Sequence, residues 1–171
     1  MRVWSNKTEV ESAKSSVARA ALAGASRETL LREALNALVK AGAADRIGVW
    51  LEVDSNASRL TEVPTVFHGF VWDREQPHCP REWLNLSVEP PLPEELLLTG
   101  KTVERHLGAS DESAIIGQLV GLRHALWIPV ASGEQLKGVI LLGSKGKPLG
   151  PSRERAEAVA AQLALALELQ Q

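Results

Sequence analysis

Apolar and polar positions form their clearest pattern in the last third of the chain. Residues 123–130 (RHALWIPV) and 136–143 (LKGVILLG) are two apolar runs of strand length, and the first is apolar on both faces. The polar stretch ASGE between them supplies a turn, in which Gly133 is able to take a positive φ. These features predict an antiparallel hairpin whose first strand lies inside a sheet.

A long helix is predicted after this hairpin, over residues 153–169, with Ser152 as its N-cap. A surface helix needs one apolar stripe, whereas this helix has two. We expect one stripe to pack on the sheet and the other to meet a second helix. The first stripe is Ala156, Val159, Leu163 and Leu167, and the second is Ala158, Ala161, Leu165 and Leu169.

The first half of the chain predicts a helix followed by two strands. Residues 26–40 have a helical pattern that Ser26 is placed to cap. Residues 46–53 alternate as a strand, with Trp50 on the face opposite the more continuous apolar set. Residues 62–72 predict the strand that pairs with it.

The middle of the chain is its least regular part. Residues 73–93 hold five of the nine prolines, and a loop of this length in a compact domain is usually functional or mobile. We expect a short strand, a short helix, another short strand and a helix at residues 83–88, 94–98, 101–105 and 111–120.

The C-terminal pattern resembles the second half of a GAF domain. The resemblance covers RHALWIPVASGEQLKGVILLGSKGKPLGPSRERAEAVAAQLALAL and is carried by Ile128-Pro129-Val130, Gly138-Val139-Ile140 and the helix from Arg153. With the predicted helix and hairpin before it, the resemblance extends over residues 26–169 in the order of the family.

This resemblance implies an α/β (α+β) fold of the GAF type. A central antiparallel sheet would carry the N- and C-terminal helices on one face. Short helices and the proline-rich loop would cover a pocket on the other face. GAF domains are small-molecule sensing and dimerisation modules of larger signalling proteins, so the resemblance also implies a regulatory role.

Composition narrows the remaining classes of function. The 171 residues suit one domain with a tail, and a net charge of −2 gives no broad basic field for nucleic acid or an anionic membrane. No run approaches the length of a membrane-spanning helix, and no signal peptide is recognisable. One cysteine excludes an intramolecular disulfide framework and fits a reducing compartment, so we expect a cytoplasmic protein.

Residues 1–25 are interpreted as a helical linker ahead of a domain that spans residues 26–171. Small residues in the linker recur at the three-four spacing of a coiled-coil seam. We expect the linker and the second stripe of the last helix to join two copies into a homodimer; a frayed tail is the alternative. The expected interface residues are Val10, Ala13, Val17, Ala20, Leu165 and Leu169.

Side chains able to carry chemistry are sparse in the sequence. The four histidines lack the close helical spacing of a metal pair, and Cys79 precedes a proline instead of standing in the boxes that attach bilins in photosensory relatives. His124, on a buried strand, is interpreted as a core histidine. No catalytic triad or paired carboxylates can be assembled, so we expect neither a metal site nor an enzyme.

The pocket hypothesis rests on five tryptophans in a chain with no tyrosine and two phenylalanines. Indoles suit pocket walls as well as cores. We expect an apolar pocket for a planar or partly aromatic ligand, with Arg105 and His106 as polar anchors, lined by Trp50, Trp72, Trp83 and Trp127. The alternative is that the indoles fill this space themselves.

The favoured function is therefore a non-catalytic regulatory domain that binds a small ligand or relays a signal through its helices. The parent protein would be a sensor histidine kinase, a cyclic-dinucleotide enzyme or a transcriptional regulator, with its output domain elsewhere. Two alternatives stay open: a structural dimerisation module without a ligand, and a small enzyme of the same fold. The sequence names neither the ligand nor a cofactor.

Overall fold

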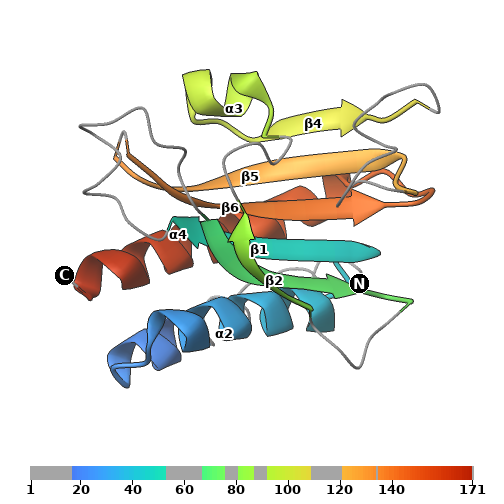
Figure 1. Cartoon of the computed structure of the whole chain (residues 1–171). Helices are drawn as coiled ribbons and strands as arrows, with labels where there is room; N and C mark the ends of the chain where they lie inside the picture. The colour runs from blue at the N-terminus through green and yellow to red at the C-terminus, as the bar shows by residue number, and fades with distance from the viewer. Residues whose placement is uncertain are drawn as a thin grey trace, which may run out of the picture.

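The computed structural model describes residues 17–52, 67–75, 81–86, 92–108, 121–133 and 135–170, with the backbone alone for residues 81–86. The described strands form one six-stranded sheet in the order β3-β2-β1-β6-β5-β4 (Figure 1). Each strand pairs antiparallel with its neighbour. The mixed α/β architecture with an antiparallel sheet is the one expected from the sequence.

The strands are β1 (Arg46–Glu52), β2 (Phe67–Asp73), β3 (Arg81–Leu86), β4 (Val103–His106), β5 (His124–Ser132) and β6 (Gln135–Ser144). The helices are α2 (Arg27–Lys40), α3 (Glu94–Thr99) and α4 (Gly150–Leu169), and residues 17–22 are also helical. The helix expected over residues 111–120 lies outside the described residues.

Both predicted hairpins are confirmed. Strands β5 and β6 pair through a turn in which Gly133 has φ 60°, and β5 also pairs with β4, so it lies inside the sheet. Strand β1 pairs with β2 on one side and β6 on the other, which places it at the centre of the sheet. The strand expected near residues 83–88 is observed as the edge strand β3, two residues earlier.

Two apolar clusters cover the two faces of the sheet. Helices α2 and α4 pack side by side against one face (Figure 1), where they bury what we call the helix-side core. Its members include Leu38, Ile47, Val49, Ile140 and Leu163. The opposite face carries a second cluster, the tryptophan-side core, which comprises Trp50, Phe67, Val71, Leu96, Val103, Leu107, Leu122, Ala125, Trp127, Val139 and Leu141.

The caps of the two long helices follow different rules. Ser26 caps α2 as expected, because its hydroxyl oxygen accepts a hydrogen bond from the Thr29 backbone N–H. The expected cap at Ser152 is wrong. Helix α4 begins at Gly150, with Pro151 in its first turn, where no N–H donor is needed. The Ser152 hydroxyl donates instead to the carbonyl of Ala43, 2.6 Å away, and ties α4 to the segment that follows α2.

An ion pair joins the ends of β1 and β2. Arg46 Nε lies 2.8 Å from an oxygen of Asp73, and both side chains are largely buried. Burial alone would raise the pKa of Asp73, but the Glu75 N–H and the Arg46 guanidinium outweigh it and lower this pKa below its ordinary value. The pair therefore stabilises the strand ends at neutral pH, and this contribution is lost as the pH falls through the folded-state pKa.

Candidate functional site

Trp50 organises the face of the sheet that lies away from α2 and α4. Its side chain is 4% exposed and belongs to the tryptophan-side core. A Cβ atom added to Gly48 would lie 2.1 Å from the Trp50 six-membered ring, and one added to Gly69 would lie 2.7 Å from Cδ1 of the five-membered ring. The indole therefore lies across β1 and β2 at the two positions where glycine leaves room for it.

Trp127 shares this face, on β5. It is 3% exposed and packs in the same cluster as Leu96 of α3 and Val103 of β4, so these elements cover the indoles. The expected orientation of Trp50 and Trp127, away from the long helices, is confirmed. The Trp50 indole N–H is buried and has no hydrogen-bond acceptor among the described residues. A buried donor without an acceptor costs free energy, so this N–H is available to an acceptor from outside the described residues.

Two of the expected pocket residues lie on the wrong face. Trp72 packs against the helix-side core, because it alternates with Val71 along β2. His106 pairs with His124, which is next to Ala125 of the tryptophan-side core and therefore points to the other face. Neither side chain reaches Trp50.

The other two expected residues have different outcomes. Arg105 pairs with Ala125 and so lies on the tryptophan side, but it is exposed and forms an ion pair of 3.4 Å with Glu95 of α3. It lies at the rim of this face. Trp83 belongs to β3, where its backbone pairs with Gly69, and its side chain lies outside the described part of the chain.

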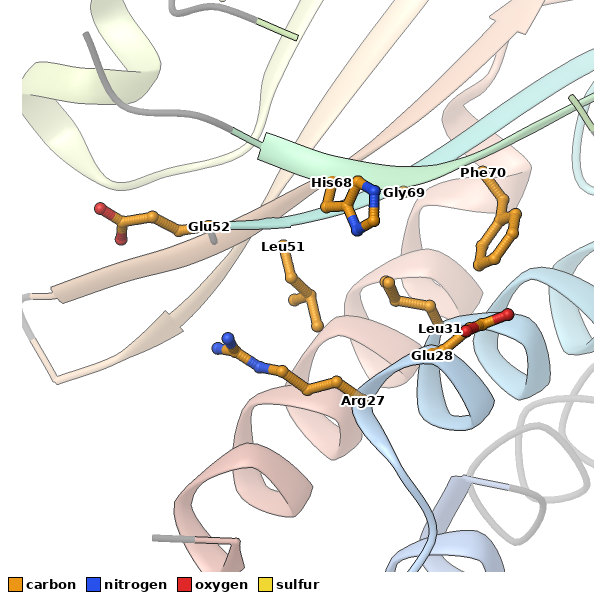
Figure 2. Close-up of a pocket in the computed structure, with 8 residues that line it drawn as sticks. All are labelled: Arg27, Glu28, Leu31, Leu51, Glu52, His68, Gly69 and Phe70. Carbon is orange, nitrogen blue, oxygen red and sulfur yellow. The ribbon is translucent and has the colours of Figure 1, made fainter. Parts of the chain in front are cut away.

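A cavity that the sequence did not indicate lies on the helix side of the sheet. It has a volume of about 160 Å³, between the first turns of α2 and the neighbouring ends of β1 and β2. Figure 2 shows that Leu31 points from α2 towards Leu51 and Phe70. Arg27 and His68 lie at the rim of the cavity. Glu52 borders this space, and its side chain extends away from Leu51 (Figure 2). Its apolar interior has room for a body the size of a benzene ring.

A wider and more open groove runs between α4 and the edge of the sheet. Its volume is about 390 Å³, and its walls include Thr102, Pro129 and Glu157. The Thr102 hydroxyl donates to Glu157 at 2.9 Å, and Arg153 donates to the same carboxylate oxygen at 2.9 Å. These polar groups already hydrogen-bond to one another, so they do not indicate a ligand in the groove.

The expected interface residues fall into three groups. Leu165 and Leu169 on α4 are 54% and 71% exposed, so the second stripe of this helix is open on a single chain. Val17 is fully buried in the helix-side core, and Ala20 packs partly against it. These two side chains are therefore occupied within the chain and do not form a free seam. Val10 and Ala13 lie outside the described residues.

The described residues hold no group of three or more His, Cys, Asp or Glu side chains that could bind a metal ion. None of the described helices combines the length and apolar character needed to cross a membrane.

Comparisons with known proteins agree with this geometry. The sequence pattern of the GAF domain family matches residues 26–167. The phycoerythrobilin-bound GAF domain from a cyanobacterial phytochrome is similar, with a TM-score of 0.71 and 12% identity over 94% of this chain and 95% of that chain. Comparison with curated protein sequences gives no match.

Two further solved structures are similar. Free methionine-R-sulfoxide reductase from Neisseria meningitidis, in complex with its substrate, has a TM-score of 0.69 and 16% identity over 96% of this chain and 89% of that chain. The GAF domain of a two-component sensor histidine kinase from Bacillus halodurans has a TM-score of 0.58 and 19% identity, over 81% and 93%. At these identities the likeness establishes the fold.

Proposed function

This chain belongs to the GAF domain family, and we propose that it is a cytoplasmic regulatory module that senses a small molecule without transforming it. The parent protein is a sensor histidine kinase, a cyclic-dinucleotide enzyme or a transcriptional regulator. A ligand binds on the tryptophan side, against Trp50 and Trp127, and changes the position of the terminal helices on the other face. The observation that carries this proposal is the buried Trp50 N–H, which has no acceptor among the described residues.

The physical route from ligand to helices is short. Strand β1 presents Trp50 to one face, while its neighbours Val49 and Leu51 belong to the helix-side core. A shift of the Trp50 indole therefore acts on the backbone that also carries the contacts of α2. Because packed cores resist continuous deformation, such a shift favours a discrete change in helix packing.

The test of this function is native mass spectrometry of freshly purified protein, with Trp50→Phe as the matched variant. Phenylalanine keeps an aromatic ring and removes the N–H donor. We expect a small molecule to be retained by the unaltered chain and lost or strongly reduced in the variant. Equal retention by both proteins, or retention by neither, would contradict a ligand held by the Trp50 N–H.

A structural module without a ligand is the second candidate, because Trp50 and Trp127 are themselves almost fully buried in an apolar cluster. In that case the indoles serve as core. The mass spectra separate the two candidates, since a purely structural module retains no small molecule.

Homodimerisation through α4 is a further part of the proposal. It is supported by the exposure of Leu165 and Leu169, two large apolar side chains four residues apart on one helix. Replacing both with glutamate is expected to convert a dimer into a monomer, measured by light scattering over a range of concentrations. The control is Glu154→Gln, an exposed change near the other end of α4. A monomer at every concentration of the unaltered chain would refute this assembly.

A further inference from the structure

His106 and His124 face each other across the two strands at one edge of the sheet. They are direct partners in the β4–β5 register, and their Nδ1 atoms lie 3.4 Å apart. The ring centroids are 4.8 Å apart, with an interplanar angle of 62°. His106 is exposed and His124 is partly buried, so solvent reaches the pair. This pairing departs from the core role that the sequence suggested for His124.

The distance between these nitrogens matches the geometry of a bound metal ion. Tetrahedral Zn²⁺ holds imidazole nitrogens at about 2.0–2.1 Å, which places two such nitrogens about 3.3–3.4 Å apart. We propose that His106 and His124 form a two-histidine site for a late first-row transition-metal ion such as Zn²⁺. Water completes the coordination, and imidazole ligands favour Zn²⁺, Cu²⁺ or Ni²⁺ over Mg²⁺ or Ca²⁺.

The backbone around the two histidines holds them in place. The β4–β5 ladder sets their separation, and it continues beyond His106, where the Leu107 N–H donates to the Arg123 carbonyl. The Arg123 N–H in turn donates to Ser144 of β6 at 2.8 Å, which fixes the start of β5. Because the ladder orders both residues in advance, the separation of the two rings is set before a metal ion binds.

The charges along β4 favour a cation on this face. Glu104 lies two residues before His106 and therefore on the same face of the strand. Arg105 lies on the opposite face, where it pairs with Glu95. The carboxylate thus faces the side of the proposed site, and the guanidinium of β4 is turned away.

A bound metal ion would fasten the edge strand to the sheet. Strand β4 pairs with β5 alone among the described strands. Val103 begins β4 and Leu107 follows its last residue, and both belong to the tryptophan-side core. The metal ion would lie on the face of the sheet opposite Trp50. It therefore acts at a place separate from the proposed ligand, and each of the two is testable without the other.

The experiment is a titration of the full chain with Zn²⁺ after treatment with a chelator, followed by calorimetry and thermal unfolding. The variants are His106→Asn and His124→Asn, and the matched control is His68→Asn, an exposed histidine on β2. We expect the unaltered chain and the control to bind Zn²⁺ and to gain thermal stability. Each of the two test variants should bind at least tenfold more weakly, and Mg²⁺ should have no effect.

Two further readouts keep the result clear. Unfolding temperatures without metal show whether the variants fold, and binding should weaken as the pH is lowered, because protons compete for the imidazole nitrogens. Absence of Zn²⁺ binding by the unaltered chain, or less than a tenfold loss in either test variant, overturns the proposal. In the second case the ion is held elsewhere, and the 3.4 Å contact is an ordinary hydrogen bond between two rings.

Discussion

Replacing Gly69 with alanine is expected to lower the free energy of unfolding by about 3 kcal/mol. The added Cβ would lie 1.9 Å from the carbonyl oxygen of Val49 and 2.7 Å from the Cα of Trp50. Both atoms belong to the backbone of β1, which is paired on both sides, so they are unable to move away without breaking the ladder. Urea unfolding at one fixed protein concentration measures the change.

Gly146→Ala is the matched control for this substitution. Gly146 has no positive φ, and a Cβ added there would meet no atom within 4 Å. Its effect should stay within about 0.5 kcal/mol, as for ordinary surface changes. If Gly69→Ala is as mild as the control, the close approach of β1 and β2 at this position is wrong.

The order of the elements could be predicted from the sequence because each depends on a local signal. The apolar runs at 123–130 and 136–143 predicted β5 and β6, and Ser26 marked the start of α2. The face of the sheet on which Trp50 lies could also be predicted from the sequence. Side chains alternate along a strand, and the larger apolar set of β1 was expected to meet the long helices.

What could not be predicted depends on register between distant segments. Trp72 was placed on the wrong face because the sequence does not say which residues of a bent strand pair with β1. His106 and His124 are 18 residues apart, and only the pairing of β4 with β5 joins them. The helix-side cavity between Leu31 and Leu51 likewise forms from segments with no shared motif.

The cap of α4 shows a different limit, a competition between two local rules. Serine before a helix favours an N-cap, whereas proline in the first turn favours an earlier start. Helix α4 begins before Ser152, with Pro151 in its first turn. The Ser152 hydroxyl donates to the carbonyl of Ala43, which is far away in the sequence. Local signals of similar strength are decided by tertiary contacts that the sequence alone does not reveal.

Gly48→Ala should lower the free energy of unfolding by about 1–3 kcal/mol, which is a smaller loss than that expected for Gly69→Ala. The added methyl group would lie 2.1 Å from Cη2 and 2.6 Å from Cζ3 of Trp50. These atoms are the far end of a side chain, which is able to tilt, whereas Gly69 faces backbone. Trp50→Leu alone should lower the free energy of unfolding by a few kcal/mol, because it leaves a cavity among the buried residues of the tryptophan-side core.

A double-mutant cycle distinguishes these two kinds of clash. In Gly48→Ala/Trp50→Leu the new methyl group enters space that the indole has left, so the combined loss should be about 1–2 kcal/mol smaller than the sum of the single losses. In Gly69→Ala/Trp50→Leu the methyl group still meets the Val49 carbonyl oxygen, and the clash that dominates Gly69→Ala should persist. Urea unfolding of Gly48→Ala, Gly69→Ala, Trp50→Leu and the two double variants measures the difference. If the losses of Gly48→Ala and Trp50→Leu add strictly in the double variant, the Trp50 ring does not lie over β1. The ligand face proposed for this domain would then be wrong.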